Sequence, residues 1–87
     1  MYRLDYHKKV IKFLAKQDLK FREKVLDIFD EIAMSPYSSD YDIKPYKTTK
    51  NNHYRLRIGK YRFIYRIDVD EIIIYVSDAD SRGDIYK

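Results

Sequence analysis

The chain has 87 residues, of which 45% are hydrophobic and 16% aromatic, and its formal net charge is +4. A chain of this length supports one hydrophobic core, so we expect a single domain spanning residues 1–87. The hydrophobic content excludes intrinsic disorder, and the absence of cysteine excludes disulfides and thiolate metal sites. The longest apolar run covers residues 72–76, far short of a membrane span. With no signal-peptide core in MYRLDYHKK, we expect a cytoplasmic protein that does not contact membranes.

Positive charge is concentrated in one segment. Residues 1–42 carry eight basic and eight acidic side chains, whereas residues 43–67 carry eight basic and no acidic side chains. Residues 68–87 carry two basic and six acidic side chains. A segment that holds the whole excess of cations is typical of a polyanion-binding surface. A solvated basic face is the alternative, and composition alone does not separate the two.

The first half of the chain has the pattern of one short strand followed by two helices. Alternating apolar residues predict a strand over residues 2–6, and helical spacing predicts a helix over residues 7–16. Asp18 is a good N-cap for a second helix, which should end near Met34 because Ser35 precedes Pro36. The expected buried stripe of this helix is Phe21, Val25, Ile28, Phe29 and Ile32. Residues 35–42 are predicted to form a loop.

The second half changes to the two-residue alternation of strands. Residues 54–58 and 61–67 are predicted strands, and Gly59-Lys60 between them suits a type II′ hairpin turn. Residues 68–71 form a second turn before a strand over residues 72–76, and we assign Asp78 and Asp80 to a solvated loop. Two helices followed by such a meander predict an α+β domain, with both helices on one face of a small, mainly antiparallel sheet.

The predicted hairpin gathers arginines on one face of the sheet. With a two-residue loop, Ile58 pairs with Tyr61, and Arg57 lies opposite Arg62. Like charges in direct opposition destabilise a sheet by up to ~1 kcal/mol, and an anionic partner reverses that cost. The arginine face comprises Arg55, Arg57, Arg62 and Arg66. Guanidinium groups match phosphate oxygens bidentately, so we favour anion binding over the alternative, a charged face that protects the sheet against aggregation.

The C-terminal segment adds a cation and an aromatic ring. Arg82 and Tyr86 are close enough in sequence for a ring to stack on a base while a guanidinium holds its phosphate. Packing of Tyr86 as a terminal anchor is the alternative. His7 and His53 are the only histidines, and with no cysteine we expect no metal site.

These residues resemble a known family. Residues 54–65, YRLRIGKYRFIY, resemble the YRLRxGxYRxxY segment of the RelE/ParE toxin superfamily, and residues 82–86, RGDIY, are similar to its closing R-x-x-x-Y. The N-terminal strand, the helical pair ending at Ser35-Pro36 and the charged stretch 44–50 follow in the expected order. The resemblance covers essentially the whole chain and implies a β-α-α-β-β-β arrangement.

The resemblance also implies an activity. RelE-like toxins of type II toxin–antitoxin systems enter the A site of the 30S ribosomal subunit and cleave the bound mRNA there. They need no metal or cofactor, because the ribose 2′-OH attacks the adjacent phosphorus. The implied partners are a cognate antitoxin, the ribosome and mRNA. Operator DNA would be bound only through the toxin–antitoxin complex.

Site residues carry over by position. Arg62 matches the arginine expected to stabilise the transition state, Arg82 the C-terminal arginine, and Tyr86 the tyrosine that stacks on the base. Arg55 and Arg57 stand where some RelE toxins have lysines, and we expect them to assist catalysis. The expected phosphate-binding residues are Lys44, Lys47, Lys50, Lys60 and Arg66.

The general base is left open by the sequence. Ser81 stands where many relatives have a histidine, and the glutamate base of other relatives has no counterpart. The candidates are His53, Lys60 and Tyr86, of which His53 has the best unperturbed pKa for the task.

Two other functions fit the same fold. A ParE-like toxin would act by binding DNA gyrase and would need no catalytic residues, and a degenerate toxin would only bind RNA or its antitoxin. Arg62, Arg82 and Tyr86 favour the RelE-like activity.

Overall fold

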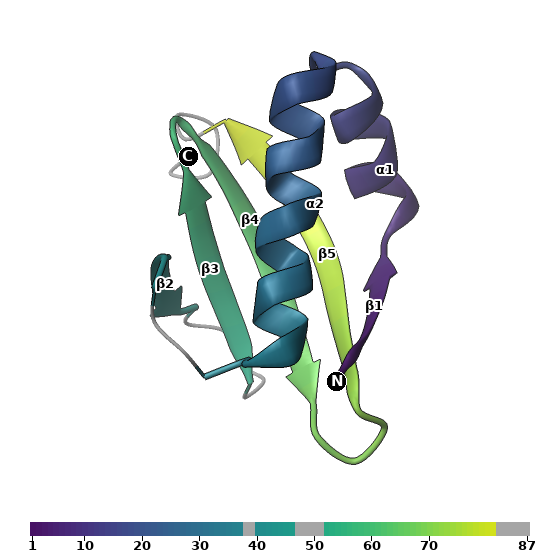
Figure 1. Cartoon of the computed structure of the whole chain (residues 1–87), viewed down its shortest axis with the longest axis vertical. Helices are drawn as coiled ribbons and strands as arrows, with labels where there is room; N and C mark the ends of the chain where they lie inside the picture. Colours follow the sequence, from purple (N-terminus) through teal and green to yellow (C-terminus); the bar gives the residue numbers. More distant parts are fainter. Residues whose placement is uncertain (38–39, 47–51, 82–87) are drawn as a thin grey trace.

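A computed structural model of the chain describes residues 1–37, 40–46 and 52–81. Its elements are β1 (Arg3–Tyr6), α1 (Lys8–Ala15), α2 (Leu19–Met34), β2 (Asp42–Pro45), β3 (His53–Ile58), β4 (Tyr61–Asp68) and β5 (Ile73–Ser81). The strands form one sheet, and α2 crosses one of its faces (Figure 1). The predicted α+β architecture is confirmed.

The sheet is mainly antiparallel. Its strand order is β1-β5-β4-β3-β2, and within it β1 and β5 run parallel while the other neighbouring pairs run antiparallel. A parallel pair needs a long crossover, and here the connection from β1 contains both helices. This connection brings the N-terminal strand to the edge of the C-terminal meander.

Both helices begin with a side-chain cap. The backbone N–H of Phe21 donates to Oδ1 of Asp18 at 2.8 Å, which confirms the predicted cap of α2. The N–H of Lys9 donates to Nδ1 of His7 at 3.0 Å, so His7 caps α1. α2 ends at Met34, as the Ser35-Pro36 pair predicts.

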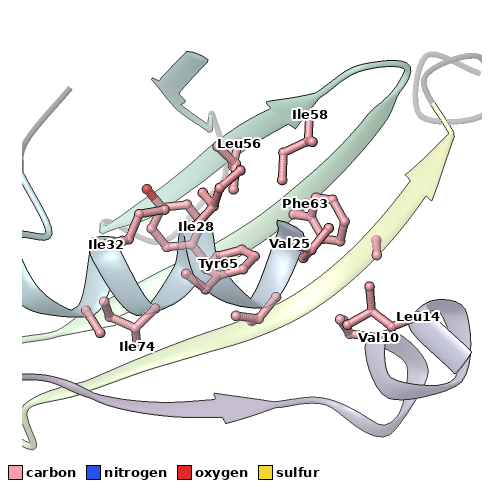
Figure 2. Packing of buried hydrophobic residues seen from close by; sticks show 14 of the residues in the cluster. Val10, Leu14, Val25, Ile28, Ile32, Leu56, Ile58, Phe63, Tyr65 and Ile74 are labelled. Atoms are coloured by element: carbon pink, nitrogen blue, oxygen red, sulfur yellow. The ribbon is translucent and has the colours of Figure 1, made fainter. Parts of the chain in front are cut away.

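The core lies between the helices and the sheet (Figure 2). Phe29 of α2 is at its centre, and its ring meets those of Tyr6, Phe63 and Tyr65 edge to face at centroid distances of 5.9, 5.9 and 5.6 Å. The predicted stripe of α2 is buried except for Phe21, which is half-buried and packs on Tyr61 at 5.0 Å. The apolar face of the sheet thus packs against the helices, and no helix in the described part of the chain covers its other face.

The β3–β4 hairpin has the predicted register. Ile58 pairs with Tyr61 and Arg57 with Arg62. Gly59 has a φ of +60°, which a first loop residue in a type II′ turn requires and glycine adopts without steric cost. The side-chain period of a strand is two, so a slip of one residue would turn the arginines into the core.

Two segments differ from the prediction. Residues 42–45 form the short edge strand β2, although they were assigned to a loop and a charged stretch. The assignment of Asp78 and Asp80 to a solvated loop was wrong, because β5 continues to Ser81. A register shift at Ile64/Tyr65 lets Ala79 face the core at 5% exposure. Tertiary pairing therefore overrides the low strand propensity of aspartate.

None of the helices that the structure describes is long and apolar enough to cross a membrane.

The turn between β4 and β5 contains a strained residue. Ile72 has a φ of +56°, a region that costs a β-branched residue about 1–2 kcal/mol, and its side chain is 52% exposed. We expect Ile72→Asn to raise the free energy of unfolding by about 0.5–1 kcal/mol in urea denaturation, because asparagine tolerates this conformation. Val69→Asn is the control, since Val69 is equally exposed in the same turn without a positive φ. Equal changes in the free energy of unfolding for the two substitutions would show that the backbone at Ile72 is not strained.

Candidate phosphate-binding groove

A groove of about 370 Å³ lies on the sheet face opposite the helices. Its lining residues are Lys44, Pro45, Tyr46, Arg55, Arg57, Arg62 and Ile64. They come from β2, β3 and β4 and from the residue that follows β2. The groove therefore joins four cations to one aromatic ring, and its described lining includes no carboxylate.

Strand register brings these cations together. Arg57 pairs with Arg62 across β3 and β4, and Arg55 pairs with Lys44 across β3 and β2. Directly opposed residues have Cβ atoms about 4.5–5.5 Å apart. Beyond β2, the N–H of Tyr46 donates to the carbonyl of His53 at 2.9 Å, which holds the tyrosine beside the arginines.

The arginines are buried to an unusual degree. Arg62 is 4% and Arg55 9% exposed, and arginine is rarely buried to this extent. Within the described residues, Nη1 of Arg55 and Nε of Arg57 are buried and have no hydrogen-bond acceptor. An N–H donor in this state costs about 1–3 kcal/mol. A phosphate in the groove would supply acceptor oxygens to these donors.

Acidic neighbours offset part of the positive charge. Nη2 of Arg55 lies 3.3 Å from Oδ1 of Asp42, whose side chain is 47% exposed. Asp80 of β5 is the cross-strand neighbour of Arg62. Two carboxylates beside four cations leave the groove positive, as an anion site requires.

Three predicted site residues lie outside the groove. Lys60 is in the hairpin turn, where its Nζ is 5.5 Å from the ring centroid of Tyr61 on the helix side of the sheet. His53 and Arg66 are paired across β3 and β4 at the far end of the sheet, and they line a separate hollow of about 340 Å³. Arg66 contacts Asp68 at 3.4 Å and the ring of Tyr75 at 5.6 Å.

Lys47, Lys50, Arg82 and Tyr86 lie outside the described residues. Their roles in phosphate binding, transition-state stabilisation and base stacking stay predictions.

Sequence reasoning missed Tyr46. The residue is 40% exposed and lines the groove, so its ring is available to stack on a base. Lys44 and Tyr46 have the two-residue spacing of one strand face. Pro45 between them argues against a strand in the sequence, because proline within a sheet is confined to edge strands, strand starts and bulges.

The described residues hold no group of three or more histidine, aspartate or glutamate side chains that could bind a metal ion.

Mutation of Arg57 should separate stability from anion binding. We expect Arg57→Gln to stabilise the fold in low salt by about 0.2–1 kcal/mol, because the repulsion from Arg62 disappears. Inorganic phosphate should raise the Tm of the wild-type protein above its value in chloride of equal ionic strength, and Arg57→Gln should reduce this increase. Thermal unfolding measures both effects. Arg3→Gln, an exposed arginine on β1, is the control and should keep the wild-type response. A full phosphate response in Arg57→Gln would exclude the groove as the site.

Comparison with known proteins identifies the family. A family model described as the ParE toxin of the type II toxin-antitoxin system parDE matches residues 4–86. The structure is similar to the archaeal RelE-RelB complex from Pyrococcus horikoshii OT3, with a TM-score of 0.83 and 27% identity over 95% of this chain and 97% of that chain. A search of curated proteins finds no match.

Two more distant structures share the fold. The isolated E. coli RelE toxin has a TM-score of 0.74 and 19% identity over 99% of this chain and 92% of that chain. The intact E. coli RelBE toxin-antitoxin complex has a TM-score of 0.74 and 18% identity over 93% and 96%. The chain therefore belongs to the ParE toxin family of type II toxin–antitoxin systems and has the fold of the RelE toxins.

Proposed function

We propose that this toxin is a ribosome-dependent endoribonuclease that cleaves mRNA in the A site and binds the scissile phosphate in the groove. The observation that carries the proposal is the Arg57–Arg62 pair, which lies inside a groove that also holds Arg55 and Lys44. Asp42 and Asp80 offset part of the repulsion between these like charges, and a bound anion would offset more of it. Phosphate is an anion that guanidinium groups bind bidentately.

The proposed reaction is an attack by the ribose 2′-oxygen on the neighbouring phosphorus. A bond forms between the 2′-oxygen and phosphorus, the bond to the 5′-oxygen breaks, and a cyclic phosphate and a free 5′-hydroxyl result. Negative charge grows on the phosphoryl oxygens in the transition state. Arg62 and Arg57 would stabilise this charge from fixed positions, which is the most effective form of electrostatic catalysis.

Two protons move in this reaction, one from the 2′-hydroxyl and one to the 5′-oxygen. Arginine is a poor carrier because it stays charged. Lys44 and Tyr46 are the residues with transferable protons in the described lining of the groove. We assign them to proton transfer and base stacking, respectively, together with the predicted role of Tyr86. His53 and Lys60 would need to approach from outside the groove.

Inhibition of DNA gyrase is the second candidate function. The match of residues 4–86 to the ParE family model favours it. In that case the groove would be an interaction surface and would need no proton carrier.

The test is mRNA cleavage on translating ribosomes, with naked RNA as control. We expect Arg62→Ala to lower the cleavage rate by about 10²–10³-fold, the usual loss when one transition-state donor is removed. Arg62→Lys, which keeps the charge of this buried side chain, should fold and still cleave slowly because it lacks the bidentate fork. Arg3→Ala is the matched control and should cleave at the wild-type rate. Circular dichroism checks folding.

The other outcomes of the cleavage test would favour a different function. Growth arrest and loss of gyrase supercoiling without cleavage would overturn the nuclease in favour of the ParE-like activity. A folded protein that causes neither effect would be a degenerate toxin or a binding module.

We also propose a cognate antitoxin as partner. The structures from P. horikoshii and Methanococcus jannaschii are described as complexes of RelE with RelB. In this chain, β1 and β2 are the outer strands of the sheet, and β2 borders the basic groove. An added strand or helix with acidic residues would fit this border.

Co-expression tests the antitoxin. Expression of the toxin alone should arrest bacterial growth, and co-expression with the protein encoded by the adjacent gene should restore it. Counting of viable cells after induction measures both effects, and the Arg62→Ala toxin is the control. Normal growth at a high yield of folded wild-type toxin, without a partner, would contradict a toxin held silent by an antitoxin.

A further inference from the structure

A second basic groove lies on the opposite side of the molecule, between α1 and the end of β5. Its volume is about 450 Å³. The lining residues are His7, Lys8, Lys9, Lys12, Phe13, Lys16 and Ala79. Four of these side chains are lysines, and the described lining includes no acidic residue.

Three of the lysines form a ridge along α1. Lys8, Lys12 and Lys16 are four residues apart and exposed, so they follow one side of the helix at intervals of about 6 Å. Like charges at this spacing repel each other, and lysine in the first turn opposes the helix dipole. Lys12 is in the last turn, where a cation is favourable, so the costs of the ridge are the repulsion between its lysines and the position of Lys8 in the first turn.

Acidic side chains do not compensate the ridge. Residues 7–16, HKKVIKFLAK, contain none. Lys9 lies off the ridge and binds Oδ1 of Asp78 at 2.9 Å, which raises the pKa of the lysine. Within the described residues, no ion pair joins Lys8, Lys12 or Lys16 to a carboxylate.

The lysines of α2 have a different setting. Lys20 is three residues before Glu23, and Lys24 is three residues before Asp27. Opposite charges at this spacing are neighbours on a helix and stabilise it. The uncompensated charge is therefore specific to α1.

We propose that the ridge formed by Lys8, Lys12 and Lys16 binds the sugar-phosphate backbone of RNA, at a segment other than the one proposed for the groove that Arg55, Arg57 and Arg62 line (the arginine groove). The inference rests on the proposed function only in taking RNA as the polyanion. Cations at regular intervals match the regular charges of a nucleic acid strand, and lysine binds phosphate as a point charge without needing a fixed orientation.

A protein partner fits the groove less well. Binding energy between proteins is concentrated in apolar and aromatic anchors. In the described lining, Phe13 is engaged by the rings of Tyr61 and Phe63 at 5.4 and 5.9 Å, and Ala79 is 5% exposed. Neither residue offers a protruding anchor.

Two consecutive residues near the end of β5 are associated with the two grooves. Ala79 lines the α1 groove, and the next residue, Asp80, is the cross-strand neighbour of Arg62 in the arginine groove. Successive strand residues point to opposite faces. A folded RNA that surrounds this end of the sheet would therefore contact both grooves at once, one on each face.

The test is RNA binding by the full chain, measured by fluorescence anisotropy with a labelled RNA hairpin between about 50 and 200 mM salt. The test variant is Lys8→Gln/Lys12→Gln/Lys16→Gln, which leaves the Lys9–Asp78 pair intact. The matched control is Arg3→Gln/Lys20→Gln/Lys24→Gln, which removes three exposed cations outside both grooves. Both variants lower the net charge by the same amount. Glutamine is a good helix former, and circular dichroism confirms folding.

We expect the slope of log K against log salt to decrease in magnitude by about 2–3 in the ridge variant, the effect of three lost phosphate contacts. The control variant should keep a slope close to that of the wild type. Equal changes in both variants would overturn the proposal, because net charge alone would explain binding. An unchanged slope combined with weaker binding of the co-expressed antitoxin would also overturn it and make the ridge a protein interface.

Failure of the two proposals is distinguishable. The anisotropy assay measures RNA binding by the ridge variant without any cleavage, and the cleavage assay with Arg62→Ala tests the arginines while the ridge is intact. If the ridge variant and the control variant show the same salt slope while the wild-type protein cleaves mRNA on ribosomes, this inference is rejected and the proposed function stands.

Discussion

The register of the β3–β4 hairpin is the constraint on which the structure depends. Gly59 adopts a positive φ in a two-residue turn, and this turn sets Arg57 opposite Arg62. The same register directs Phe63 and Tyr65 toward Phe29 of α2. A shift of one residue would turn the arginines toward the helices and the aromatic rings toward the opposite face of the sheet. The β3–β4 register therefore fixes both the core on one face of the sheet and the candidate site on the other, and a change in register would disrupt both.

Like charges lie close together in two places, and their repulsion lowers the stability of the fold. Arg57 and Arg62 oppose each other in the sheet, and the lysines of α1 repeat at one-turn intervals without acidic neighbours. The repulsion within each arrangement costs a modest amount of stability, which Asp42 and Asp80 partly offset for the arginines. A fold with a net stability of only about 5–15 kcal/mol can carry such costs because the apolar core is complete. A bound polyanion would offset the repulsion in both arrangements, and the two proposals rest on this common physical argument.

The short strand β2 forms one side of the arginine groove. It pairs Lys44 with Arg55 and brings Tyr46 to the rim. Asp42 from the same strand holds Arg55 at 3.3 Å, while Nη1 of Arg55 and Nε of Arg57 are buried without an acceptor among the described residues. Preorganised donors of this kind are what transition-state stabilisation needs. A strand of four residues with a proline at its end thereby contributes a cation, a ring and an orienting carboxylate.

The sequence by itself determined the features that depend on neighbouring residues. Helical and strand periodicity, the Asp18 cap, the end of α2 before Pro36 and the Gly59 turn are local, and the arginine pair follows from that turn. Tertiary structure decided what depends on distant segments. Pairing with β4 extended β5 through Asp78 and Asp80, pairing with β3 created β2, and packing put Lys60 and His53 outside the groove. Such contacts carry no local signal, because the free energy that forms them comes from burial and pairing across the fold.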